Sequence, residues 1–163
     1  MNIESLKIWD EISYSGELIV MRDAAHKRLK ELMDDNKKLP VDLNKKIIFY
    51  AGPAKSLDGF PVGSIGPTTS NRMDPFLDMV FSLGVLGTIG KGKRSSVAIS
   101  MCKKYKRVYF VTPSGSAAVM AKKVIKRKVL AFNDLGTEAI QLLEVVDFPL
   151  LVAIDSNGNS IFK

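Results

Sequence analysis

The feature that most constrains the fold is an alternation of short apolar runs with stretches of helical periodicity along the whole chain. Apolar runs bounded by Gly, Pro or Ser are typical of strands, whereas apolar residues recurring at the spacing of a helical turn predict amphipathic helices. Strands that alternate with helices pack as a sheet covered by helices. The sequence therefore predicts a mixed α/β protein.

The individual elements follow from the same pattern. Strands are predicted at 12–14, 18–21, 47–51, 86–89, 108–112, 124–132, 143–147, 150–155 and, after an Asn157-Gly158 turn, 160–162. Helices are predicted at 24–34, 76–83, from 95 to about 104, from a Ser114 cap to Lys122, and at 137–142. Ser15-Gly16 is interpreted as a turn between the first two strands. Asp23 and Asp74 are each interpreted as the N-cap of the helix that follows.

A long glycine- and proline-rich stretch, 52–71, interrupts this pattern, and stretches of this length inside a compact domain are often functional. Residues 63–74 combine glycines, hydroxyls and an arginine just before an apolar run, and residues 90–95 repeat that combination. Glycine lets backbone N–H groups approach a ligand, helix N-termini favour negative charge, and arginine matches a carboxylate. Both segments predict the binding of a small anion.

Three cations, Arg22, Arg72 and Lys91, each stand between a predicted strand and a predicted helix. In α/β sheets the ligand crevice lies beyond the carboxyl ends of the strands. If the three strand ends share one crevice, two arginines and a lysine converge there, a set that suits a dicarboxylate.

Composition excludes several classes. The 163 residues fit one domain, and one cysteine and one histidine exclude an internal disulfide and a Cys/His metal site. The net charge of +7 is concentrated at 103–107 and 122–128, which lack interleaved aromatics and are interpreted as solvated faces, so no nucleic acid is expected. Without a membrane-length apolar run or a signal-peptide pattern, a cytoplasmic protein with no membrane contact is the expectation.

Six segments in the same order resemble the C-terminal domain, or separate β subunit, of class I iron–sulfur fumarases and L-tartrate dehydratases. They are 15–28 (Ser15-Gly16 and Arg22 to Arg28), 50–55, 63–74, 90–95, 135–140 and 146–149. The resemblance implies one domain over 1–163 with a swivelling β/β/α fold, in which a mixed sheet carries flanking helices.

The resemblance also implies roles for individual residues. Thr68 matches the general base of the family, Arg22 and Arg72 match arginines that bind substrate carboxylates, and Lys91 matches a lysine of the same site. The [4Fe-4S] cluster of the family is held by three cysteines of the other, α-type domain, so no metal ligand is expected in this chain. The partners implied are a cluster-bearing α subunit and a small dicarboxylate, in a homodimeric or α2β2-type assembly.

For Thr68 a second interpretation stands beside the first. A hydroxyl is a very weak base unless nearby cations stabilise its alkoxide, and threonines in loops commonly hydrogen-bond the loop backbone instead. Asp23 and His26, one helical turn apart, are expected to contact each other at the helix start. They are expected to position the residues that bind substrate rather than to take part in the chemistry. Asp74 is expected to shape the loop as an N-cap, whereas Arg94, like Lys93, is expected to be solvated or to face a partner. Cys102 is expected to be buried.

Together these observations predict the β subunit of a two-subunit hydro-lyase that interconverts fumarate and L-malate, inactive without its partner. One alternative is the β subunit of L(+)-tartrate dehydratase, which converts tartrate to oxaloacetate. A more distant alternative is a non-catalytic assembly or regulatory module, and an RNA-binding protein is the last.

Overall fold

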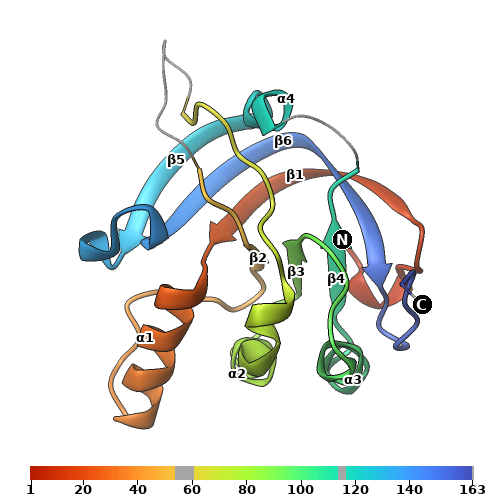
Figure 1. The fold of residues 1–163 in the computed structure, drawn as a ribbon, viewed down its shortest axis with the longest axis horizontal. Helices are drawn as coiled ribbons and strands as arrows, with labels where there is room; N and C mark the ends of the chain where they lie inside the picture. Colours follow the sequence, from red (N-terminus) through yellow and green to blue (C-terminus); the bar gives the residue numbers. More distant parts are fainter. Residues whose placement is uncertain (54–60, 114–116, 163) are drawn as a thin grey trace.

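The computed structural model describes residues 1–53, 61–113 and 117–162, in which helices and strands alternate as the sequence predicts (Figure 1). The strands are β1 (Glu11–Val20), β2 (Ile47–Phe49), β3 (Gly87–Gly90), β4 (Val108–Val111), β5 (Val124–Ala131) and β6 (Ile140–Ile154). The α-helices are α1 (Asp23–Asp34), α2 (Leu77–Ser82), α3 (Ser96–Tyr105) and α4 (Ala117–Ala121). Short 3₁₀ helices form at η1 (Ile3–Ser5), η2 (Asn71–Phe76) and η3 (Asn133–Glu138).

The six strands form one mixed sheet in the order β1-β2-β3-β4-β6-β5, and an additional β1–β6 pairing closes it into a barrel. β1, β2, β3 and β4 run parallel to one another, whereas β6 runs antiparallel to β1, β4 and β5. In Figure 1, β5, β6 and β1 curve across the top, and α1, α2 and α3 lie below the short parallel strands. The three parallel strands β1, β2 and β3 therefore end at one common edge.

Alternation of side chains along the strands builds two core clusters. One lies on the barrel side and includes Leu18, Phe49 and Phe110 together with residues of α4. The other lies between the sheet and α1, α2 and α3, and includes Ile19 and Tyr109. Because neighbouring residues of β1 and β4 enter opposite clusters, both faces of these strands are buried.

β1 is one continuous strand, so the predicted turn at Ser15-Gly16 is wrong. The pairing of β1 with β6 shifts between Tyr14 and Gly16, which leaves one extra residue on β1 as in a β-bulge. Gly16 has φ 152°, and a Cβ there would lie 2.8 Å from the Tyr14 hydroxyl. Bulges and turns both favour glycine, and only pairing with the long β6 distinguishes them.

β6 is likewise longer than predicted, because it joins residues 140–142, predicted as the end of a helix, to the two predicted strands that follow. η3 (Asn133–Glu138) ends just before it, and Gly136 within η3 has a φ of 61° and a ψ of −119°, which are not helical. The apolar residues of this region fit a helical spacing, but pairing with β1 and β5 on both sides fixes them as a strand. At the C-terminal end the predicted return strand is reduced to an isolated bridge between Ile154 and Ser160.

α1 and α3 confirm the predicted helices 24–34 and 95–104, but both predicted aspartate caps are wrong. Arg22 occupies the N-cap of α1, and the Ala24 N–H there donates to Glu138 Oε1 at 3.4 Å. Asp74 lies inside η2, ahead of α2. The predicted Ser114 cap lies outside the described residues. Among the described residues no helix has the length and apolarity needed to cross a membrane.

Candidate functional site

The predicted site residues meet at the common edge of β1, β2 and β3. Arg22 follows the end of β1, and Lys91 follows β3 directly. The segment that carries Thr68 lies between them, because Pro67 forms a β-bridge with Ala51 and Thr69 forms one with Lys91. Segments far apart in the sequence therefore come together at this edge.

Thr68 is held by its backbone rather than by its hydroxyl. Its N–H donates to the Tyr50 carbonyl at 2.8 Å, and its carbonyl accepts from the Lys91 N–H at 3.1 Å. Thr68 Oγ1 is buried and has no hydrogen-bond partner among the described residues. Leaving a buried hydroxyl unpaired costs about 1–3 kcal/mol, so this oxygen is available to a hydrogen-bonding group outside the described residues.

Arg22 is partly buried at the start of α1, where its Nε also lacks a partner among the described residues. A Cβ on Gly52 would lie 3.4 Å from Arg22 Nη1, so the absence of a side chain at Gly52 leaves room for the guanidinium. The Arg22 carbonyl accepts from the His26 N–H at 3.0 Å and contacts His26 Nδ1 at 2.6 Å. His26 thereby fixes the backbone of Arg22.

The tautomer of His26 follows from that contact. A carbonyl only accepts, so Nδ1 carries the proton and the buried Nε2, which has no partner among the described residues, carries a lone pair. The ring lies near Tyr50 and Phe76, with centroids 5.8 and 5.3 Å away. Burial lowers the pKa of His26 from 6.5 to about 4, so the ring is neutral at physiological pH.

Asp23 pairs with Arg72 through Oδ2, and its Oδ1 has no hydrogen-bond partner among the described residues. Burial lowers the pKa of His26 by more than the negative charge of Asp23 raises it. Arg72 Nε lies 3.2 Å from Asp23 Oδ2, and the two side chains are 51% and 37% exposed. This pair connects the Thr68 segment to the start of α1. An exposed pair contributes at most about 1 kcal/mol, so it can exchange for another carboxylate at little cost.

Lys91 is exposed between two glycines at the end of β3. Its ammonium forms no ion pair within the described ranges, and Gly92, with φ 86°, turns the chain away immediately after it. Arg22, Arg72 and Lys91 thus give this edge a positive charge, and Asp23 pairs with one of the three, Arg72.

Beneath this edge lies an ion pair that the sequence analysis missed. Arg94, predicted to be solvated, is 4% exposed, and its Nε lies 2.6 Å from Oδ1 of the buried Asp74. Its guanidinium also donates to Thr88 Oγ1 at 2.8 Å and stacks on Tyr50 and Tyr109, 5.2 and 4.8 Å from the ring centroids. Although burial opposes the charge, Tyr50 and Asp74 raise the pKa of Arg94, which stays protonated.

Two signals could have pointed to this pair. Thr88 is a polar residue within an apolar strand, and a buried hydroxyl needs a partner. Asp74 and Arg94 also each stand directly before a helical run. Neither signal names the partner, because the two residues are 20 positions apart.

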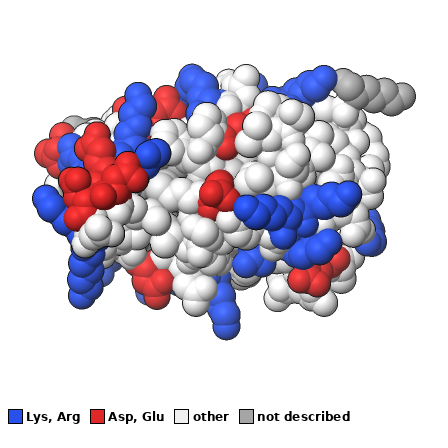
Figure 2. Space-filling view, turned by 90° about the horizontal axis from the view of Figure 1, so that it is seen from below, with Lys and Arg blue, Asp and Glu red and all other residues white. Residues whose placement is uncertain are grey.

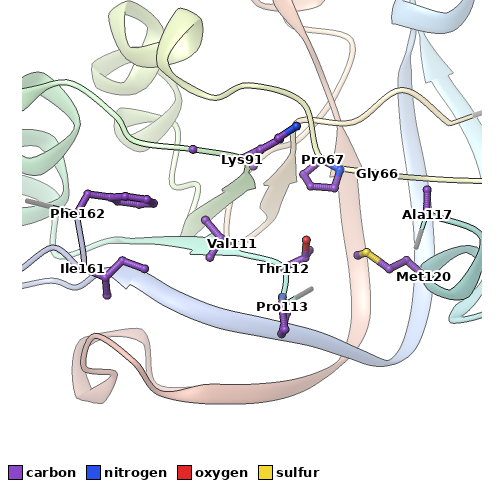
Figure 3. Close-up of a pocket in the computed structure, with 12 residues that line it drawn as sticks. Gly66, Pro67, Lys91, Val111, Thr112, Pro113, Ala117, Met120, Ile161 and Phe162 are labelled. Atoms are coloured by element: carbon purple, nitrogen blue, oxygen red, sulfur yellow. The ribbon is translucent and has the colours of Figure 1, made fainter. Parts of the chain in front are cut away.

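A pocket of about 490 Å³ lies next to Lys91 but does not include the two arginines or Thr68 (Figure 3). Figure 3 shows Lys91 and Pro67 on one side of it and Thr112, Pro113 and Met120 on the other. Lys91 is its one charged lining residue among the described residues. Arg22 and Arg72 lie outside this pocket.

The described residues do not form a metal site. No three His, Cys, Asp or Glu side chains are grouped to hold a metal ion in 1–53, 61–113 and 117–162. Cys102, the single cysteine of the sequence, is buried as predicted, and burial raises its pKa to about 12. It is therefore a neutral thiol, whereas metal ligation requires the thiolate.

The face seen from below the helices carries both signs of charge (Figure 2). Acidic side chains gather on the α1 side, and basic side chains are interspersed with acidic ones over the rest of that face. A continuous basic stripe, the footprint of nucleic-acid binding, is not seen on the described part of this face.

Comparison with known proteins adds independent findings. The family described as Fumarase C-terminus matches residues 1–163. "Fumarate hydratase class I, anaerobic" of Escherichia coli (strain K12) is 43% identical over 154 residues, covering 93% of this chain and 28% of that protein. "Putative L(+)-tartrate dehydratase subunit beta" of Methanocaldococcus jannaschii is 39% identical, covering 99% of this chain and 86% of that protein.

"L(+)-tartrate dehydratase subunit beta" of Escherichia coli (strain K12) is 34% identical, covering 98% of this chain and 81% of that protein. The chain thus spans 27% to 28% of the length of the fumarate hydratases that it matches, and most of the length of the tartrate dehydratase subunits.

Proposed function

Since the chain belongs to the fumarase C-terminus family, we propose that it is the β subunit of an iron–sulfur hydro-lyase that interconverts fumarate and L-malate. The observation that carries the proposal is the meeting of Arg22, Thr68, Arg72 and Lys91 at one open edge of the sheet. We further propose that residues 1–163 form a single domain of the swivelling β/β/α type. The closed mixed sheet, with α1, α2 and α3 on one side, supports that fold.

The cations bind and orient the dicarboxylate. Arg72 exchanges its exposed contact with Asp23 for one substrate carboxylate, and Arg22, whose Nε lacks a partner among the described residues, binds the other. Arginine offers two parallel N–H donors to a carboxylate, which fixes the plane of that group as well as its position. Lys91 adds a third cation at the same edge.

Thr68 then moves the proton. In the direction of fumarate, the C–H bond next to one carboxylate of malate breaks and its proton passes to Thr68 Oγ1. The electron pair of that bond forms the new C=C bond, and hydroxide leaves the neighbouring carbon. Thr68 Oγ1 acts as an alkoxide, which is accessible only where cations stabilise it. None of the described residues hydrogen-bonds Thr68 Oγ1, which leaves this oxygen able to accept the proton.

Class I iron–sulfur fumarases, which this chain resembles, imply a [4Fe-4S] cluster, but the residues of this chain do not fit one. A cluster of this kind needs several thiolates, and the sequence offers one cysteine, which is buried and neutral. We therefore propose that a partner α subunit holds the cluster and covers the open edge. An α2β2-type or homodimeric assembly would bring the two halves together.

Substrate choice has two candidates. The higher identity to fumarate hydratases, 43% against 34% to 39% for the tartrate enzymes, favours fumarate. The match along most of the tartrate dehydratase β subunits favours L(+)-tartrate, which carries one more hydroxyl. A non-catalytic assembly module has less support, because it would not need the four site residues.

The test is reconstitution with a cluster-bearing α-type subunit under anaerobic conditions. We expect the complex to hydrate fumarate, and L(+)-tartrate to react at least tenfold more slowly. Preferential dehydration of tartrate would assign the second candidate. A complex that assembles with an intact cluster but converts neither substrate would support the non-catalytic module.

A further inference from the structure

We infer that Arg94 is a positioning residue that locks the segment carrying the base and Arg72 onto the segment carrying Lys91. The inference rests on the proposed function for its role in catalysis, but its structural part stands on contacts within this chain. The residues involved are called the clamp, and they are Ser70, Asp74, Arg94, Ser95 and Tyr109.

Asp74 is the first fixed point of the clamp. Its Oδ1 accepts from Arg94 Nε at 2.6 Å, and its Oδ2 accepts from the Ser95 N–H and hydroxyl at 2.8 and 2.7 Å. Ser95 is the N-cap of α3, so the end of the Thr68 segment is tied to the start of the helix that follows Lys91. Both carboxylate oxygens are used within the chain, and none is left to compete with a substrate for the cations.

Ser70 is the second fixed point, two residues from Thr68. Its N–H donates to the Lys91 carbonyl at 3.1 Å, and its Oγ accepts from the Lys91 N–H at 2.9 Å. Arg94 Nη2 donates to the Ser70 carbonyl at 3.4 Å. A Cβ on Gly90 would overlap Ser70 Oγ, so this approach requires glycine at the end of β3.

Tyr109 closes the clamp from below. Its hydroxyl donates to the Gly92 carbonyl at 2.8 Å and lies 2.9 Å from Ser70 Oγ, so it touches both segments at once. Tyr50 connects the clamp to Thr68, because its carbonyl accepts from the Thr68 N–H and its hydroxyl accepts a hydrogen bond from Arg94 Nη2 at 3.3 Å. Thr68 and Lys91 are therefore placed by one set of contacts centred on the Arg94 guanidinium.

The burial of Arg94 separates its role from that of the site cations. At 4% exposure and paired with Asp74, its guanidinium cannot reach a substrate carboxylate, whereas Arg72 and Lys91 are exposed. A guanidinium reaches Asp74, Thr88 and Ser70 at the same time through its separate N–H groups, which a lysine ammonium on one stem cannot do. Misplacing a reacting group by about 1 Å can cost about 100-fold in rate.

The experiment uses two variants and a matched control. Arg94→Lys keeps the buried charge but loses the separate N–H donors of the guanidinium, and Tyr109→Phe removes only the hydroxyl that joins the two segments. Tyr105→Phe removes a tyrosine hydroxyl bonded to Asp78 at 2.6 Å on the surface, away from the clamp. In the reconstituted complex we expect kcat to fall about 100-fold for Arg94→Lys and about tenfold for Tyr109→Phe. KM should change less than threefold, and Tyr105→Phe should match the unaltered complex.

Amide hydrogen exchange on the chain itself tests the clamp independently of activity. We expect the amides of Thr68, Ser70 and Lys91 to exchange about tenfold faster in Tyr109→Phe, whereas those of α1 and β6 stay unchanged. If Arg94 only stabilises the fold, both variants will melt earlier but keep their kcat per assembled complex, and that result would overturn the inference.

If Arg94→Lys does not fold, Tyr109→Phe decides alone. An inactive unaltered complex would refute the proposed function, and the exchange measurement would still decide whether the clamp exists. Unchanged exchange at the three amides would overturn the inference even if the complex is active.

Discussion

Replacement of Thr68 by alanine should separate catalysis from stability more cleanly than any other change at this edge. The Thr68 hydroxyl makes no hydrogen bond to the described residues, and the two backbone bonds that hold the segment do not involve the side chain. Alanine keeps both of those bonds. The side chain therefore contributes to the fold only through packing and through the burial of its hydroxyl.

The expected stability change is small because the two contributions oppose each other. Removing the methyl group costs about 0.8 kcal/mol of apolar burial, and removing an unpaired buried hydroxyl recovers about 1–3 kcal/mol. Thr68→Ala should consequently unfold with a free energy about 0 to 2 kcal/mol higher than that of the original chain. If Thr68 is the base, kcat should fall about 10²- to 10⁴-fold with little change in KM.

The measurements are urea unfolding of the chain and steady-state kinetics of the reconstituted complex, and Thr69→Ala is the matched control. Thr69 is exposed and joins the Lys91 segment through its backbone, so its alanine variant should keep most of the activity. A loss of more than about 2 kcal/mol in Thr68→Ala would show that the hydroxyl braces the loop. A near-normal kcat, or equal losses at both positions, would refute its role as the base.

Four further outcomes are expected. Arg72→Lys should impair both kcat and KM, since an ammonium cannot reproduce the bidentate contact, while the free energy of unfolding changes by less than about 1 kcal/mol because the pair with Asp23 is exposed. Asp74→Asn and Arg94→Met should each destabilise the chain by about 3–5 kcal/mol in urea unfolding. The double variant should lose less than the sum of the two single losses, and additive losses would contradict a buried ion pair. The pKa of His26 is lowered from 6.5 to about 4, so as the pH falls the unfolded chain binds a proton on this ring before the folded chain does. The free energy of unfolding should therefore fall by up to about 3 kcal/mol between pH 6.5 and pH 4, and His26→Gln should flatten this dependence. The isolated chain should purify without stoichiometric iron and sulfide, because its single cysteine cannot hold a cluster; their presence would refute the assignment of the cluster to a partner.

The sequence predicted the parts of the fold that depend on local signals. The helices at α1 and α3 followed from apolar periodicity, and β2, β3 and β4 followed from short apolar runs. The same runs explain why the cations were expected at one edge, because parallel strands deliver the residues that follow them to the same side. The roles of Arg22, Thr68, Arg72 and Lys91 stay predictions, and they came from the resemblance rather than from spacing.

Tertiary pairing decided what local signals left open. The Ser15-Gly16 step is compatible with a turn or a bulge, and residues 140–142 are compatible with a helix or a strand. The pairing of β6 with β1 and β5 selected the second in each case. Asp74 has the composition of a helix cap, yet it became the partner of an arginine that pattern alone assigned to solvent. In each case the deciding neighbour is distant in the sequence.

The sequence alone therefore indicated the α/β class, the presence of a single cysteine, and which cations and hydroxyls lie in the loops. Only the folded structure decided which of those cations are exposed at the edge and which one is buried beneath it. The physical reason is that desolvating a charge depends on all the elements around it: Arg94 is buried because Asp74, Thr88, Tyr50 and Tyr109 meet there from four separate segments. Thr88 lies six positions from Arg94, but Asp74 and Tyr50 lie 20 and 44 positions away, beyond any local pattern.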